Sequence, residues 1–589
     1  MIDIRSVSSR AIAPSALEAC LKVVFVLFDS LNRHALSCYA GAAGAPAGRV
    51  DHSAGRVDHS AGVAAQSLAK AVASTPNFQR LAERSAVFDR HFVGSLPCMP
   101  ARRDIQTGRL NFLHRGWGPL EPFDRSIAEL LGARGVYTHL ITDHYHYFED
   151  GGTGFHGRYA SWDFIRGQEK DKWRPRLRPD VDKFAARFDE RQHDFGRDMN
   201  GKLPYYVNRE YLEQAGLFPL TQCFDGADEF LAHHHAEEDW FLHLECFDPH
   251  EPFFAPERFL PAATAALGGK IFDWPSYGKS DLSPELLAQL RGNYESLVAA
   301  CDEQLGRLLD RFDRHDLWQD TWLILSTDHG LLLGEKEFLG KNRPPFFNEV
   351  AHIPLLIAAP ARRGQPARRV RSLTQTIDIM PTLLDIFGLE QPPEVQGSSL
   401  LPLLAADEPE RAERGCIYGQ FGAAINFTDG RYTYFRYPVP AQAADLNQYT
   451  LMPMHMRSYF EAMEFTEARV VDPLPFTQGY PLWKLPIRMD AKANMTRRYP
   501  LLDARTVIYD IDADPQQCSP LEDPALEAEL IGKLLALLRL NDAPSELYAR
   551  YGLETPETLE TLETPEAPEP PQATLPAPAN PHPATQESR

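Results

Sequence analysis

Two apolar runs constrain the fold more than any other feature of this 589-residue chain. The run LKVVFVLFD (residues 21–29) is rich in β-branched residues and ends at Asp29. The run TWLILSTDHG (residues 321–330) ends in the same way, at Asp328 and His329 before a glycine. Such runs are typical of buried parallel strands, whose carboxyl ends collect functional groups. The sequence therefore predicts two core strands that present acids at their ends.

Segments with helical character lie between these runs. Residues 76–85 begin with a proline, and the apolar residues of 283–312 recur at helical spacing. Strands that alternate with helices predict an α/β fold, in which helices cover both faces of a sheet. After the short helix expected at 381–389 the chain becomes Pro-rich and acidic, which favours a domain boundary. We therefore assign the main domain to residues 21–405.

Residues 413–545 predict a smaller α+β domain. Three stretches alternate aromatic and polar residues around a DG turn and predict an antiparallel sheet, and a helix expected at 524–540 would cover one face. The tail at 553–589 is rich in Pro, Glu and Thr and predicts disorder, and the tandem repeat AGRVDHS at 47–60 predicts a flexible surface loop. The three stretches are residues 416–422, 425–438 and 506–512.

Composition and charge exclude several classes of function. The net charge of −21 and the isoelectric point near 5.4 disfavour nucleic acid as a partner, because phosphate contacts need a basic face. The 8 cysteines lack paired spacing, so we expect neither a disulfide framework nor a CxxC zinc site. The first apolar run, 23–28, is too short for a signal peptide or a membrane span. This predicts a cytoplasmic protein with no membrane partner, and leaves homo-oligomer formation open.

The segment SLPCMPARRDIQTGR (residues 95–109) carries the chemistry. Cys98, Pro100 and Arg102 form a C-x-P-x-R motif, and TGR follows it. This pattern resembles the signature of the type I sulfatases, which belong to the alkaline phosphatase superfamily, and of their phosphonate monoester hydrolase branch. Further phrases in that family's order extend the resemblance over roughly residues 21–540. They are STPNFQRLAERSAVFDRHF (74–92), PHEPF (249–253), TDHG (327–330), GK (340–341) and IYDIDADPQQ (508–517).

The resemblance implies an alkaline phosphatase-like fold, with a large, mixed, mostly parallel sheet between helices and a smaller C-terminal α+β domain. It also implies that a formylglycine-generating enzyme oxidises Cys98 to formylglycine and recognises Pro100 and Arg102. One oxygen of the hydrated aldehyde would attack sulfur or phosphorus, and the second would expel the inorganic group. Arg102 is expected to hold the diol by charge-assisted hydrogen bonds.

The resemblance also implies one divalent cation. By position, Asp29, Asp328 and His329 match the family's metal ligands, together with the side chain derived from Cys98. Ser30 stands where many sulfatases have a second ligating aspartate, which weakens a calcium site, and an imidazole nitrogen suits manganese. We predict calcium, with manganese as the alternative.

Further residues match the family's charge-handling groups. His250 of PHEPF corresponds to a histidine that contacts the transferred group or protonates the leaving oxygen, and Lys341 of GK to a lysine that neutralises charge. Both are predicted to be catalytic and to bind substrate. TDHYHYFEDGG (142–152) stands where many sulfatases have G-K-W-H-x-G, so that lysine is missing. We expect His144 to bind substrate there and His146 to act in catalysis.

These residues predict the hydrolysis of a small-molecule sulfate ester. The alternative is a phosphonate monoester or phosphodiester hydrolase, because Ser30, the DH pair at 328–329 and the predicted cytoplasmic location resemble that branch. A sulfate monoester and a phosphodiester also carry the same charge. The remote alternative is an inactive binding module that keeps Cys98 as a thiol. Three segments are expected to wall the pocket, namely 144–164, 203–211 and 452–463.

Overall fold

The computed structural model describes residues 21–40, 74–196, 201–267, 269–405, 414–439, 446–487 and 501–553. The repeat at 47–60 and all but the first residue of the predicted tail at 553–589 lie outside these residues. The surface loop and the disordered tail therefore stay predictions.

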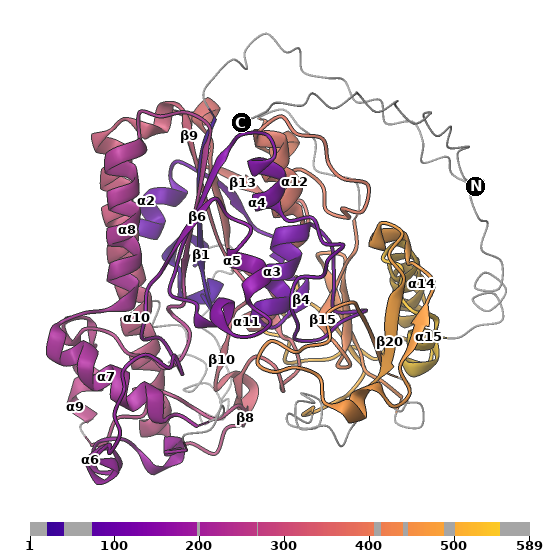
Figure 1. Ribbon diagram of the computed structural model, residues 1–589. Coiled ribbons are helices and arrows are strands. Elements are labelled where there is room, and N and C mark those ends of the chain that lie inside the picture. Colours follow the sequence, from indigo (N-terminus) through magenta and orange to yellow (C-terminus); the bar gives the residue numbers. More distant parts are fainter. Residues whose placement is uncertain are drawn as a thin grey trace, which may run out of the picture.

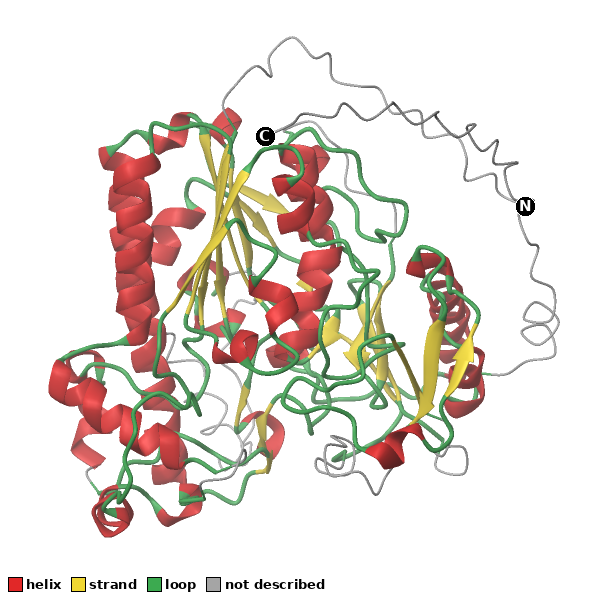
Figure 2. Ribbon diagram, in the orientation of Figure 1, coloured by secondary structure: helices red, strands yellow, loops and turns green. Residues whose placement is uncertain are grey.

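An eight-stranded sheet forms the centre of the molecule (Figures 1 and 2). Its strand order is β13-β2-β12-β9-β1-β7-β5-β6. Neighbouring strands run parallel except where β12 pairs with β9 and β2, which confirms the predicted mixed, mostly parallel sheet. The strands are β1 (Lys22–Phe28), β2 (Ala86–Phe88), β5 (Tyr137–Thr142), β6 (Ser161–Phe164), β7 (Trp240–Cys246), β9 (Thr321–Thr327), β12 (Leu355–Ala358) and β13 (Arg368–Val370).

The two strands expected from the apolar runs are β1 and β9, which pair in parallel. Every residue of β1 is buried. Because side chains alternate along a strand, Val24 and Val26 enter the core on one face of the sheet, whereas Val23 and Phe25 enter the core on the other. Burial on both faces explains why the sequence of this strand is a continuous apolar run.

Helices cover both faces of the sheet (Figure 1). The helices α2 (Pro76–Ala82), α8 (Pro219–His234) and α10 (Pro284–Arg314) contribute to one core, and their apolar side chains pack with Val24 and Val26. The opposite core receives α3 (Cys98–Thr107), α4 (Ile127–Gly132) and α12 (Ile379–Ile386). The helices predicted at 76–85, 283–312 and 381–389 correspond to α2, α10 and α12.

The smaller C-terminal sheet has the order β21-β17-β16-β15-β4 and is antiparallel except for the pair β15–β4. Strand β4 (Ser95–Leu96) comes from the N-terminal part of the chain and ends two residues before Cys98. The C-terminal sheet therefore supports the segment that leads into α3. The other elements here are β15 (Cys416–Gln420), β16 (Ile425–Thr428), β17 (Tyr432–Arg436), β21 (Val507–Asp510), α14 (Pro524–Leu540) and α15 (Ser545–Arg550).

The remaining strands belong to three smaller sheets. In the part of the chain that the structure describes, no helix combines the length and the apolar character that a membrane crossing requires. The remaining elements are β3 (His91–Phe92), α5 (Thr153–His156), α6 (Val181–Arg187), α7 (Leu203–Ala215), α9 (Ala262–Leu267), β8 (Gly278–Lys279), β10 (Leu332–Leu333), β11 (Phe338–Gly340), α11 (Asn348–Ala351), β14 (Thr374–Gln375), β18 (Asn447–Thr450), β19 (Arg469–Val471) and β20 (Leu482–Pro486).

Candidate active site

The carboxyl ends of β1 and β9 bring two buried acids together. Asp29 follows β1 and Asp328 follows β9, and neither side chain is exposed. The backbone N–H groups of Ser30 and His329 donate to Oδ1 of Asp328 at 3.0 and 2.7 Å. These bonds hold the turn after each strand against the same carboxylate, so the acids lie where the sequence pattern predicts them.

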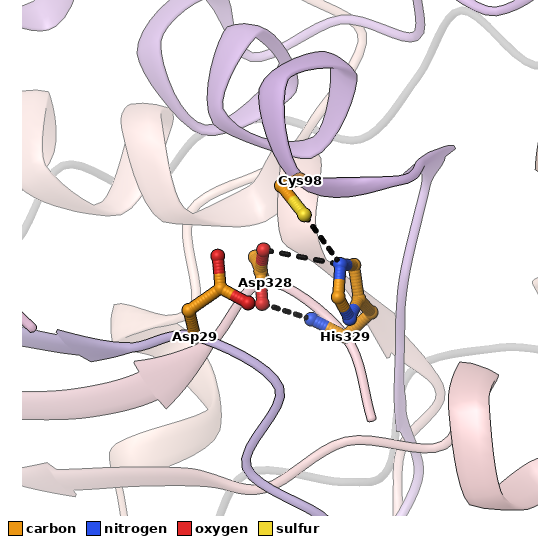
Figure 3. A group of neighbouring side chains, drawn as sticks. All are labelled: Asp29, Cys98, Asp328 and His329. Atoms are coloured by element: carbon orange, nitrogen blue, oxygen red, sulfur yellow. Dashed lines mark hydrogen bonds and ion pairs between the residues drawn. The ribbon is translucent and has the colours of Figure 1, made fainter. Parts of the chain in front are cut away.

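Cys98 completes this cluster from a different element. It is the first residue of α3, and its Sγ lies 3.2 Å from Nε2 of His329 (Figure 3). One ligand atom from each of Asp29, Cys98, Asp328 and His329 lies within 4.8 Å of all the others. The structure therefore gathers all four residues that the resemblance assigned to the metal.

Electrostatics favour a divalent cation among these side chains. Burial and the charge of Asp29 raise the pKa of Asp328 to about 6. Burial opposes ionisation of Asp29 as well, but Lys341 and Arg102 outweigh it and hold its pKa well below the usual value. Two neighbouring carboxylates that are buried away from water repel each other, and a cation would stabilise the negative charge of both. Carboxylate oxygens with one imidazole nitrogen suit Ca²⁺ or Mn²⁺. The donor set fits the predicted metal.

Arg102 binds the acids of this site. Its guanidinium is 1% exposed and lies 2.9 Å from Asp29, 2.7 Å from Glu245 and 2.6 Å from Asp328. Burial lowers its pKa, but these three carboxylates raise it well above the usual value. Towards residue 98 it donates to the backbone carbonyl of Cys98, at 3.2 Å. Arg102 is therefore a fixed cation that orients acids, whereas the sequence suggested a contact with the side chain at 98.

Lys341 reaches the same cluster from the segment after β11. Its Nζ donates to the Ser30 hydroxyl at 2.8 Å and lies 3.5 Å from Oδ1 of Asp29. The Ser30 hydroxyl in turn donates to Asp29 at 2.7 Å. Burial lowers the pKa of Lys341, but the charges at Cys98 and Asp29 raise it above its usual value. Ser30, which stands where many sulfatases have a carboxylate, thus links a permanent cation to a predicted metal ligand.

Of the two histidines predicted at 142–152, His144 is fully buried and His146 lines the cavity. His144 is fully buried, with Nε2 3.4 Å from Oδ2 of Asp29, and burial together with Arg102 lowers its pKa to about 3. His146 lies in the cavity wall, and its Nδ1 is 2.7 Å from Glu149. His144 therefore lies beside Asp29 and outside the cavity lining, and its predicted contact with substrate stays a prediction.

His250 lies in the cavity wall after β7. Its Nδ1 is 2.5 Å from the carbonyl oxygen of Glu251, and a carbonyl can only accept, so Nδ1 carries a hydrogen. This bond sets the ring orientation and directs the other nitrogen away from the Glu251 carbonyl. The ring packs against Phe247 at a centroid distance of 4.2 Å.

A cavity of about 660 Å³ opens above the cluster. Cys98, His146, His250 and Lys341 line it. The predicted wall segments 144–164 and 452–463 contribute through His146 and residues 455–461, but none of 203–211 lies in its lining. Helix α7 instead turns Tyr205 and Arg209 towards a smaller neighbouring cavity. The further lining residues are Pro97, Trp117, Glu169, Lys170, Asp194, Lys202, Glu251, Trp274, Pro275, Ser276, Tyr277, Asn342 and Arg343.

Glu245 is a site residue that sequence reasoning missed. It lies on β7, is fully buried, and accepts hydrogen bonds from Arg102 at 2.7 Å and from the Tyr147 hydroxyl at 2.7 Å. The signal was present in WFLHLEC (residues 240–246), where an acid interrupts an apolar run. A carboxylate in a buried strand needs a paired cation, and Arg102 supplies it.

Comparison with known proteins identifies the family. Residues 22–389 match the family described as Sulfatase. The chain belongs to the sulfatase family. A second match, over residues 334–465, is to the family described as N-sulphoglucosamine sulphohydrolase, C-terminal. The predicted resemblance is confirmed.

Curated proteins and solved structures resemble this sulfatase-family chain. The choline-sulfatase of Rhizobium meliloti is 27% identical over 56% of this chain and 66% of its own length. The multifunctional alkaline phosphatase superfamily protein PehA of Trinickia caryophylli is 25% identical over 57% of this chain and 72% of its own. The phosphonate monoester hydrolase of Agrobacterium radiobacter superposes with a TM-score of 0.54 at 20% identity, over 88% of this chain and 95% of its own. This last likeness confirms the predicted fold.

Proposed function

We propose that this protein hydrolyses sulfate esters at the Cys98 site, with formylglycine at position 98 and one divalent cation. The observation that carries the proposal is the convergence of Asp29, Cys98, Asp328 and His329 beneath one cavity, with their ligand atoms within 4.8 Å of one another. Three separate parts of the chain meet there in the order that the sulfatase resemblance implies. The family match over residues 22–389 supports the same reading.

Asp29, Asp328, His329 and the side chain at 98 would hold the cation. When bound, formylglycine and the cation would supply an activated oxygen nucleophile and withdraw charge from the transferred group. A formylglycine-generating enzyme would be the partner needed for maturation. Calcium is the proposed ion and manganese the alternative, for the reasons of ligand type given above.

Lys341 and Arg102 handle charge in different ways. Lys341 lines the cavity, so its ammonium can approach the oxygens of the transferred group while the Ser30 hydroxyl keeps it near Asp29. Arg102 is buried beneath and keeps Asp29 and Asp328 in place. One cation therefore faces substrate and the other positions the ligands.

His250 is the proposed proton donor to the leaving oxygen. Its Nδ1 hydrogen is used by the Glu251 carbonyl, so Nε2 is the nitrogen left to serve the substrate in the cavity that it lines. His146 binds Glu149 through Nδ1, and its Nε2 lies 3.3 Å from Arg457. Both ring nitrogens of His146 therefore have partners within the protein, so its proposed role is to shape the cavity wall, and proton transfer is left to His250.

A phosphonate monoester or phosphodiester hydrolase is the second candidate, and Ser30 favours it. A hydroxyl in place of a carboxylate leaves less negative charge next to Asp29, and Lys341 binds that hydroxyl at 2.8 Å. The two esters carry the same single negative charge, so the cations of the site serve either. The phosphonate monoester hydrolase of Agrobacterium radiobacter shares the fold.

Turnover of two aryl esters separates these candidates. Wild-type protein, co-produced with a formylglycine-generating enzyme and supplied with Ca²⁺ or Mn²⁺, is assayed with para-nitrophenyl sulfate and with para-nitrophenyl phenylphosphonate. A higher kcat/KM for the sulfate is expected, and a higher value for the phosphonate would assign the second function. Cys98→Ala should abolish turnover of both esters. Protein that turns over neither ester, and binds them equally with and without this change, would be the inactive binding module.

A further inference from the structure

Two lysines meet on one aromatic ring in the wall of the Cys98 cavity. The ammonium of Lys202 lies 4.4 Å from the centroid of the Trp274 ring, and that of Lys170 lies 5.7 Å from it. Nζ of Lys202 also donates to the Trp274 carbonyl at 3.5 Å. All three residues line the cavity that contains Cys98. Two positive charges therefore share one wall of the substrate cavity.

These residues come from three separate segments, and the ring between them is fixed. Lys170 lies between β6 and α6, Lys202 directly precedes α7, and Trp274 precedes β8. The Trp274 ring is 5% exposed and packs edge-on against Tyr205 at a centroid distance of 5.1 Å. Its backbone N–H donates to Gln192 at 3.3 Å. The lysines are thus placed over a rigid platform.

The acids in the same wall are bound by the protein itself. Glu251 accepts from the Tyr277 hydroxyl, and the Glu169 carboxylate lies 3.7 Å from His146. The Glu461 side chain accepts from the backbone N–H of Glu464, in the turn at Ala462–Phe465. Each of these carboxylates therefore has a partner within the protein, while the two ammonium groups lie over the Trp274 ring.

The charge balance at Lys202 agrees with this. Burial and the neighbouring Lys170 lower the pKa of Lys202 to about 8, although Asp273, Asp194 and Glu251 act in the opposite direction. Asp273 is bound by Arg209 and Tyr205, and Asp194 accepts from the backbone of Gly196 at 3.2 Å. A buried ammonium whose pKa is lowered lacks sufficient negative charge around it. A bound anion would supply that charge.

We infer that Lys170, Lys202 and Trp274 form a subsite for a second anionic group of the substrate, and this inference rests on the proposed ester hydrolysis at Cys98. The ester would lie over Cys98 and Lys341, while a second sulfate or carboxylate of the same molecule contacts the two ammonium groups. The substrate class is therefore an ester with at least two anionic groups.

Calorimetric titration of the metal-loaded wild-type protein tests the subsite without turnover. The probes are alkane-α,ω-disulfonates of increasing length and the alkane monosulfonates of matched length, because a sulfonate has the charge and shape of a sulfate but no ester bond. The best disulfonate should bind about tenfold or more tightly than its monosulfonate, as expected for hydrogen bonds to charged groups. Equal affinities over the whole series would overturn the inference.

Variants test whether Lys170 and Lys202 cause the tighter binding of the disulfonate. Lys202→Gln and Lys170→Gln should each reduce the disulfonate preference about tenfold, while Lys202→Arg should retain most of it. Lys270→Gln is the matched control, because Lys270 is exposed and donates to the Ala185 carbonyl at 2.9 Å, outside the cavity lining. A preference that survives in the Lys170/Lys202 double variant would refute the subsite.

The same proteins keep the subsite and the proposed function distinguishable. The Lys270→Gln control should hydrolyse para-nitrophenyl sulfate, which has one anionic group, with the wild-type kcat. Loss of turnover in every protein, together with an intact disulfonate preference, would reject the sulfatase activity and leave the anion subsite standing. Normal turnover without any disulfonate preference would reject the subsite alone.

Discussion

Replacing Arg102 by methionine tests how the acids of the site are held. The guanidinium is 1% exposed and lies between 2.6 and 2.9 Å from Asp29, Glu245 and Asp328. Methionine retains much of the side-chain length but removes the charge, so three buried carboxylates lose their common cation. Breaking a buried ion pair costs about 3–5 kcal/mol, and we expect Arg102→Met to lower the free energy of unfolding by at least about 3 kcal/mol.

Urea unfolding, followed by circular dichroism, measures this loss with chelator and with saturating Ca²⁺. Arg103→Met is the control, because Arg103 donates to Asp124 at 2.7 and 3.1 Å, away from the cluster. Both variants should lose stability with chelator present. Added cation should restore part of the loss in Arg102→Met, since it replaces positive charge near Asp29 and Asp328, but should restore none in Arg103→Met beyond the wild-type response. Equal recovery of the two variants, or an Arg102→Met protein as stable as wild type, would refute the reasoning.

Further changes test the neighbouring parts of the site. Ser30→Gly suits the positive φ of 62° but removes the hydroxyl that binds Lys341, so kcat/KM should fall about tenfold with little change in melting temperature, and an unchanged value would refute the link. In Gly330→Ala, the new Cβ would lie 1.9 Å from the Glu349 carbonyl oxygen, so unfolding should become easier by about 1–3 kcal/mol; a variant with wild-type stability in urea would contradict this. The disulfonate preference should be full below the Lys202 pKa of about 8 and decline above it, because Lys202 loses its charge; calorimetry that finds a flat profile from neutral to alkaline pH would contradict that assignment.

The sequence could predict the centre of the site because its parts lie in patterns with direct physical meaning. Asp29 and Asp328 end apolar runs, and parallel strands present such ends at one edge of a sheet. Cys98 and Arg102 lie in a short motif. The motif did not indicate that the guanidinium would bind three acids, which follow β1 and β9 and lie on β7. The three acids come together because β9, β1 and β7 are neighbours in the sheet, and this strand order cannot be predicted from one sequence.

The rest of the cavity could not be predicted in the same way. Lys170, Lys202 and Trp274 lie in three segments that have neither a shared motif nor a common periodicity. They meet only in the folded chain, where the segments before α6, α7 and β8 line one cavity. The expected wall at 203–211 shows the same limit, since Lys202 lines the cavity while the helix that follows turns its aromatic residues elsewhere.

The central proposal is that residue 98 acts as formylglycine in ester hydrolysis. Mass spectrometry of the peptide that contains residue 98, on preparations with graded amounts of the formylglycine-generating enzyme, measures the fraction of aldehyde beside the kcat for para-nitrophenyl sulfate. The account predicts that kcat rises in proportion to the aldehyde fraction and is absent when only the thiol is found. Full sulfate-ester turnover by protein in which residue 98 is entirely thiol would contradict it.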